Sequence, residues 1–112
     1  MRETERDPGR IRDMLEAADY IISFVEGLTY EQFFADKIRY FAVMKNVEIL
    51  GEAANMLTEE FRVAHSEIPW KLVIKMRHVL VHGYSNILPE ILWETATQDV
   101  PQLKELLLKL NQ

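Results

Sequence analysis

The chain has 112 residues, enough for one small domain that we expect to span residues 1–112, and its lack of cysteine excludes disulfides and thiolate metal sites. Apolar residues make up 48% of it, yet no stretch approaches the ~20 apolar residues of a membrane span, and the charged N-terminus is unlike a signal peptide. We therefore expect a cytoplasmic protein that does not associate with membranes. Its net charge of −5 argues against sequence-independent binding of nucleic acid over a broad surface.

A first amphipathic helix is expected over residues 8–26. Asp7 stands before Pro8, which fits an N-cap followed by proline at the first helical position, and Gly27 marks the end. The apolar residues of this segment recur at helical spacing: Ile11, Leu15, Ala18, Ile22 and Val25.

A longer second helix is expected to begin after Thr29, which forms a capping-box pattern with Gln32, and to continue to about Leu57. Its apolar face is wider than one neighbouring helix can cover. We therefore expect this helix to be central, or to face a second subunit over part of its length.

Two further helices follow, and prolines set their starts. The third begins after Pro69 and runs to about Leu80 or His82, where Gly83 is a natural left-handed stop. The fourth begins at Pro89.

The fourth helix contains Pro101, which removes a backbone donor and should kink or break the helix near Asp99. Because the connections are short, neighbouring helices should pack antiparallel. The predicted fold class is all-α, an up-and-down four-helix bundle whose last helix is kinked or broken near Pro101.

The run from Met76 to Tyr84 carries the chemistry: Arg77, His82 and Tyr84 form the pattern R-x-x-x-x-H-x-Y. An imidazole moves protons near neutral pH, and a guanidinium holds phosphate with a fixed fork of donors. This combination suits phosphodiester chemistry without a metal. Positive charge also concentrates here, in Lys71, Lys75, Arg77 and His78.

Each residue of the motif also has a structural interpretation. Arg77 lies in an apolar stripe, so it must either open onto a polar cleft or pair with a carboxylate of the second helix, such as Asp36, Glu48 or Glu52. His82 is five positions later, which is about 500° of rotation and leaves the two residues about 140° apart. The last turn could loosen at the following glycine, or the pair could be completed across a symmetric dimer.

His82 could equally be a C-terminal cap histidine favoured by the helix dipole. His78 could be a second proton carrier, a hydrogen-bond donor to phosphate or a solvated surface residue. Tyr84 could simply pack on the end of the bundle. A metal centre is poorly supported, because His78 and His82 at positions i and i+4 lack any accompanying ligand pattern.

The motif, with Gly83-Tyr84 at its end and Gly51-Glu52-Ala53 upstream, resembles the HepT-like toxins of the HEPN superfamily. The resemblance covers nearly the full length and includes Val47–Ala53, Ile68-Pro69-Trp70 and the segment from Ile91 to Pro101. It implies a helical homodimer in which both copies of the motif line a shared cleft. It also implies a ribonuclease that needs neither metal nor other cofactor, with tRNA as the expected substrate class.

Carried over by position, the resemblance makes Arg77 and His82 the catalytic pair and His78 a supporting residue. Tyr84 matches the tyrosine to which the cognate antitoxin, a minimal nucleotidyltransferase of the MNT type, attaches AMP. The chain would then be the toxin of a type VII-like toxin–antitoxin pair. We expect the 2′-hydroxyl of RNA to attack the adjacent phosphate, with a 2′,3′-cyclic phosphate as product.

Two other functions stay open at this stage. The chain could be a non-catalytic helical dimer that binds and positions a nucleotidyltransferase, with Arg77 in a structural ion pair. It could also be a small nucleotide-binding module that uses the same basic residues.

Overall fold

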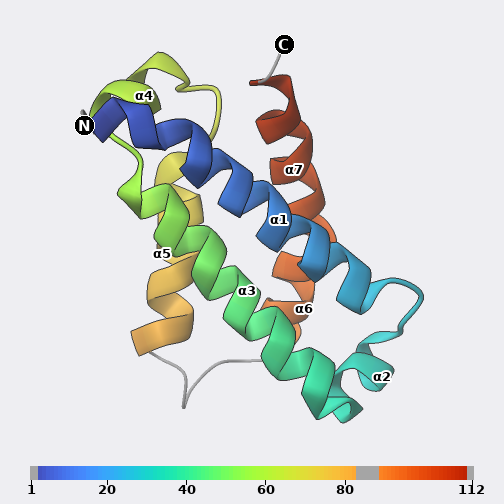
Figure 1. Cartoon of the computed structure of the whole chain (residues 1–112). Helices are drawn as coiled ribbons and strands as arrows, with labels where there is room; N and C mark the ends of the chain where they lie inside the picture. The colour runs from blue at the N-terminus through green and yellow to red at the C-terminus, as the bar shows by residue number, and fades with distance from the viewer. Residues whose placement is uncertain (1–2, 83–88, 111–112) are drawn as a thin grey trace.

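The computed structural model describes residues 3–82 and 89–110, and these form a bundle of helices without a strand (Figure 1). Of residues 3 and 78–82 only the backbone is described. The elements in chain order are the 3₁₀ turn η1 (Glu3–Arg6), α1 (Asp7–Val25), α2 (Tyr30–Ala35), α3 (Lys37–Met56), α4 (Glu59–Ala64), α5 (Trp70–His82), α6 (Pro89–Glu94), the π-helical turn η3 (Thr95–Asp99) and α7 (Val100–Lys109).

The long helices alternate in direction, which confirms the predicted all-α, up-and-down bundle (Figure 1). The middle helix α3 packs against both α1 and α5, and α7 also packs against α1. The prediction of a central second helix is therefore confirmed. Large side chains that are fully buried come from α1, α2, α3, α5, α6 and α7: Met14, Ile21, Phe33, Leu50, Val73, Leu92 and Leu107. Among the described residues, no helix combines the length and apolar character that crossing a bilayer requires.

The start of α1 differs from the prediction in the role of Asp7. The helix includes this residue, Pro8 stands in its first turn, and Arg6 is the N-cap without a side-chain capping bond. The buried Asp7 carboxylate instead accepts hydrogen bonds from Thr58, 3.0 Å from its backbone nitrogen and 2.7 Å from its hydroxyl. Because Thr58 also caps α4 by accepting from the Phe61 N–H, Asp7 ties the start of the chain to the turn between α3 and α4.

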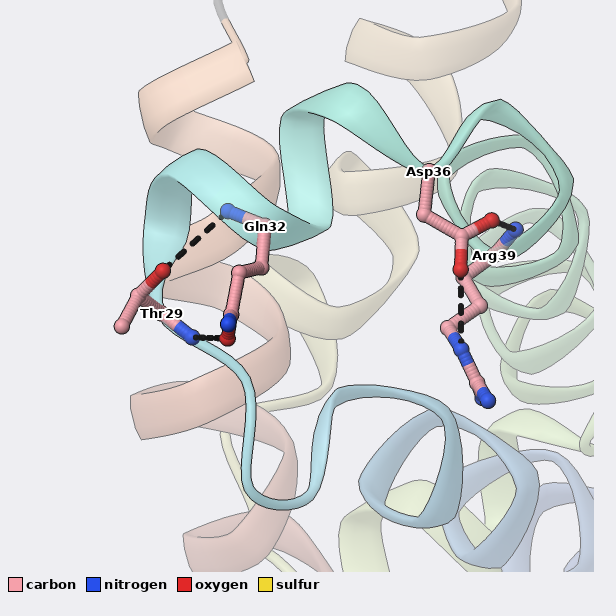
Figure 2. A network of polar contacts seen from close by, with 4 residues as sticks. All are labelled: Thr29, Gln32, Asp36 and Arg39. Atoms are coloured by element: carbon pink, nitrogen blue, oxygen red, sulfur yellow. Dashed lines mark hydrogen bonds and ion pairs between the residues drawn. The ribbon is translucent and has the colours of Figure 1, made fainter.

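The predicted second helix is two helices, α2 and α3, which meet at Asp36 (Figure 2). The capping box of Thr29 and Gln32 at the start of α2 is confirmed, with reciprocal bonds of 2.9 and 3.1 Å. Asp36 leaves the helical conformation, with φ −90° and ψ 88°. Its carboxylate accepts from the backbone N–H and the Nε of Arg39, so it caps α3 as a new helix.

The predicted start of the third helix is confirmed, because α5 begins directly after Pro69 and extends through His82. The sequence interpretation missed the short helix α4 that precedes it. The Trp70 indole N–H donates to the His65 carbonyl at 3.0 Å and anchors the connection between α4 and α5. The predicted stop at Gly83 lies outside the described residues.

The break near Pro101 is also confirmed, and it takes the form of a π-helical turn. Proline lacks an N–H, and its ring would clash with the carbonyl four residues earlier, that of Thr97. The helical turn contains one extra residue at this point, because the Val100 N–H donates to the Thr95 carbonyl five residues back instead of four. The Thr97 hydroxyl donates to the Trp93 carbonyl at 2.7 Å, which holds the widened turn together.

Candidate active site

Arg77 points from α5 toward α3, where its Nη1 donates to the carboxylate of Glu52. The arginine side chain is 19% exposed and the glutamate side chain 51% exposed, so the pair lies at the surface with the arginine stem packed against the bundle. Of the three carboxylates that the sequence offered as partners, the structure therefore selects Glu52. A functional guanidinium and a structural ion pair both agree with this contact.

Gly51 sets the distance between the two helices at this point. A Cβ atom on Gly51 would lie 2.5 Å from the Arg77 Cβ, closer than side chains tolerate, and 3.1 Å from the Arg77 backbone nitrogen. The missing side chain lets α5 cross α3 in direct contact with its backbone. Gly51 and Glu52 therefore fix the root and the tip of the Arg77 side chain from consecutive positions of one helix.

The sequence predicts three further site residues, His78, His82 and Tyr84. His78 and His82 belong to α5 by their backbone, and Tyr84 lies outside the described residues. Because α5 is helical through His82, the backbone positions of Arg77 and His82 lie about 140° apart around the helix axis. Within the described helix, the expected loosening does not occur before His82.

The surface next to the Arg77–Glu52 pair is the outward side of α3. It carries four exposed apolar side chains, which we call the outer face of α3: Ile38, Phe41, Ile49 and Met56. Two of them, Ile49 and Met56, also line a hollow of about 220 Å³ between α1 and α3, together with Glu52, Arg10 and Lys45. The candidate site therefore borders a surface of mixed apolar and charged character.

A larger pocket of about 360 Å³ lies on the other side of α5, between that helix and α6–α7. Its walls are mostly aliphatic, and Lys75 and Asp99 are its charged residues. Burial, and then the nearby charge of Glu94, raise the pKa of Asp99 above its ordinary value of 3.8. Because Lys75 lines this pocket and Arg77 faces α3, the basic residues that are close in sequence are divided between two sides of α5.

The described residues contain no group of three or more histidine, aspartate or glutamate side chains that could hold a metal ion. The sequence offered Glu52 only as one of three possible partners of Arg77, and the close contact at Gly51 was not predicted. One sequence signal points to the glycine, since a glycine inside a helix costs roughly 1 kcal/mol relative to alanine and therefore indicates close packing.

The fold is a small helical bundle that presents an arginine–carboxylate pair at its surface. Residues 14–110 match the family described as ribonuclease HepT-like, and the chain belongs to that family. It is 36% identical over 104 residues to a protein of Thermococcus cleftensis named probable ribonuclease HepT, and the match covers 93% of each chain.

Two further relatives are named as candidate RNases. The protein from Caldanaerobacter subterraneus is 35% identical over 95 residues, 85% of each chain. The protein from Methanocaldococcus jannaschii is 34% identical over 93 residues, 83% of this chain and 85% of its own length. No solved structure matches the chain significantly.

Proposed function

We propose that this chain is a cytoplasmic, metal-independent endoribonuclease and the toxin of a two-gene, type VII-like toxin–antitoxin pair. One observation carries the proposal: the R-x-x-x-x-H-x-Y motif occurs in a chain of the HepT-like ribonuclease family. The packing around Arg77 supports it, because the guanidinium is held at the surface by Glu52. The names of the relatives point to RNA as substrate, and we propose tRNA as the class of RNA.

Arg77 and His82 would divide the reaction between them. RNA carries its own nucleophile, the 2′-hydroxyl, which attacks the adjacent phosphorus. His82 takes or returns a proton in this step, and Arg77 stabilises the negative charge that develops on the phosphoryl oxygens. The 5′-oxygen of the next nucleotide leaves, and a 2′,3′-cyclic phosphate remains. His78, next to Arg77 in sequence, is proposed to support the binding of RNA or the transfer of the proton.

We propose that the active unit is a homodimer formed through the outer face of α3. Ile38 is 85% exposed and Phe41 59% exposed, which is unusual for large apolar side chains on a helix at the centre of a bundle. A symmetric contact there would set the two Arg77–Glu52 pairs around one cleft. Arg77 and His82 of one chain lie about 140° apart around the axis of α5, so they face different directions. This favours a catalytic pair made of Arg77 from one copy and His82 from the other.

Cleavage of total tRNA in EDTA tests the activity. Wild type, with bare Tyr84 verified by intact mass, should cleave, and Arg77→Ala and His82→Ala should each lose about 100-fold or more in rate. Arg39→Ala and His65→Ala are matched controls on the surface and should cleave like wild type. Inert wild type, or both site variants cleaving at full rate, would rule the proposal out.

Neutralisation is proposed to occur by transfer of AMP to Tyr84 from a cognate nucleotidyltransferase of the MNT type. The modification adds bulk and negative charge two residues from His82, which repels the RNA backbone. Tyr84→Phe should therefore cleave RNA like wild type and remain active after incubation with the nucleotidyltransferase and ATP. If this variant were inactivated as completely as wild type, modification of Tyr84 would not be the cause.

The alternative is a non-catalytic helical dimer that binds and positions a nucleotidyltransferase. The net charge of −5 favours it, because RNA-binding proteins are usually basic, and an Arg77–Glu52 ion pair of purely structural value would have the observed contact. Growth on expression of the chain alone separates the two functions. If expression of the wild-type chain arrests growth and the Arg77→Ala substitution restores it, the chain is a toxin. If cells grow normally while they contain folded protein whose Tyr84 is unmodified, the chain is a scaffold.

A further inference from the structure

We propose that Glu52 is a positioning residue of the nuclease, which holds the Arg77 guanidinium in the orientation that a phosphate needs. This inference rests on the proposed ribonuclease function and deepens it. Two observations carry it: the Glu52 carboxylate reaches Arg77 from α3, and the neighbouring Gly51 lies against the start of the Arg77 side chain.

The two ends of the Arg77 side chain are constrained from α3. At its root, Gly51 lies so close that a Cβ atom added there would be 2.5 Å from the Arg77 Cβ, so this part of α5 packs directly on the backbone of α3. At its tip, the Glu52 carboxylate accepts from Nη1. Arginine otherwise loses much of its rotamer freedom when it binds a ligand in one geometry. Pairing with Glu52 removes much of that freedom before RNA arrives.

A carboxylate at this place has the wrong charge for binding RNA directly. It is half exposed beside a group proposed to meet the phosphodiester, so it repels the substrate in the ground state. A guanidinium carries five N–H donors, more than one carboxylate can accept from, so pairing with Glu52 does not by itself prevent Arg77 from binding phosphate. Glu52 should therefore raise the rate of cleavage without tightening the binding of RNA.

Glu48 is a matched comparison on the same helix. It lies one turn before Glu52, and its carboxylate is 3.7 Å from the Lys45 ammonium instead of Arg77. Substitution of either glutamate removes one negative charge from the same side of α3. A difference between the two variants therefore reports on Arg77 and not on the general charge of this surface.

The experiment compares wild type, Glu52→Gln, Glu52→Asp and Glu48→Gln, with Arg77→Ala as the reference for a lost site. For each, single-turnover cleavage at saturating RNA, the Kd for RNA in EDTA and the melting temperature are measured. We expect Glu52→Gln to cleave about 10- to 100-fold more slowly, as misplacement of a catalytic group does. Its Kd should be unchanged or lower. Glu52→Asp should recover part of the rate, and Glu48→Gln should keep it.

The outcomes separate this inference from the function on which it rests. If wild type cleaves and Arg77→Ala does not, but Glu52→Gln cleaves at the full rate, the positioning role is wrong and the nuclease stands. The positioning role would also be wrong if Glu52→Gln cleaved RNA more slowly and its affinity for RNA fell by the same factor. It would be wrong as well if the lower rate came with a melting temperature so low that the variant is unfolded in the assay. If wild type and Arg77→Ala cleave equally, the proposed function fails and this inference fails with it.

Discussion

Asp7 shows how one residue can hold two distant parts of this chain together. Asp7 is 2% exposed, and its carboxylate accepts hydrogen bonds from both the N–H and the hydroxyl of Thr58, 51 positions away. Sequence reasoning assigned it to the cap of α1, because aspartate before proline is the usual pattern there. The residue type was therefore informative about a helix start, but its partner could come only from the tertiary fold.

Substitution of Asp7 by alanine should lower the free energy of unfolding by about 2–3 kcal/mol, since hydrogen bonds to a charged group are lost and Thr58 keeps an unpaired N–H. Urea denaturation at pH 7 measures this loss. Asp13→Ala, an exposed position on the same helix, should change stability by less than about 0.5 kcal/mol. Equal effects of the two substitutions would mean that the bonds to Thr58 contribute little to the fold.

At the scale of elements, the sequence predicted what depends on local chemistry. The capping box at Thr29, the start of α5 after Pro69 and the break near Pro101 follow from a cap or a missing N–H within a few residues. It did not predict α4, which has six residues and no buried side chain, so it has no apolar periodicity to detect. It also missed the break at Asp36, where a single non-helical residue interrupts an apolar stripe.

The candidate site divides in the same way. The motif of Arg77 and His82 is visible in the sequence, because the chemistry depends on residue types at a fixed spacing. The partner of Arg77 is not visible, since Glu48 and Glu52 are one turn apart and share a side of α3. The choice between them depends on where α5 crosses α3, and Gly51 sets that point.

The crossing of α3 and α5 can be tested at Gly51. Gly51→Ala places a methyl group 2.5 Å from the Arg77 Cβ, so the helices must separate, and overpacking of this kind costs about 1–3 kcal/mol. Gly9→Ala in α1 is the control, because its nearest neighbour would be the flexible end of Arg12 at 3.6 Å. That control should gain up to about 1 kcal/mol from helix propensity.

Urea denaturation of both glycine variants measures whether the close crossing of α3 and α5 contributes to stability. A fall in the free energy of unfolding for Gly51→Ala, with none for Gly9→Ala, supports the close crossing. RNA cleavage by Gly51→Ala should also fall, because Arg77 moves with α5. If Gly51→Ala were as stable as wild type, α5 would not lie directly on α3 at this position.

At the scale of the whole molecule, the helices are arranged in the order α5, α3, α1 and α7, and α3 keeps one side open to solvent (Figure 1). A chain of 112 residues that leaves Ile38, Phe41, Ile49 and Met56 exposed on its central helix has a surface suited to a second copy. The acidic net charge does not oppose such a dimer at the apolar outer face. In the proposed dimer, this charge would confine RNA binding to the place where the two Arg77 residues converge.

The proposed sharing of one site by two copies predicts complementation between inactive variants. Arg77→Ala and His82→Ala, unfolded and refolded together, should form heterodimers in which one of the two sites has both functional residues. Random pairing gives heterodimers in half of the molecules, so cleavage should recover to about a quarter of the wild-type rate. Each variant refolded alone should remain inactive, and differently tagged chains purified in tandem establish that heterodimers are present. No recovery in verified heterodimers would mean that Arg77 and His82 act from the same chain, in which case α5 must depart from helical geometry before His82 to bring them together.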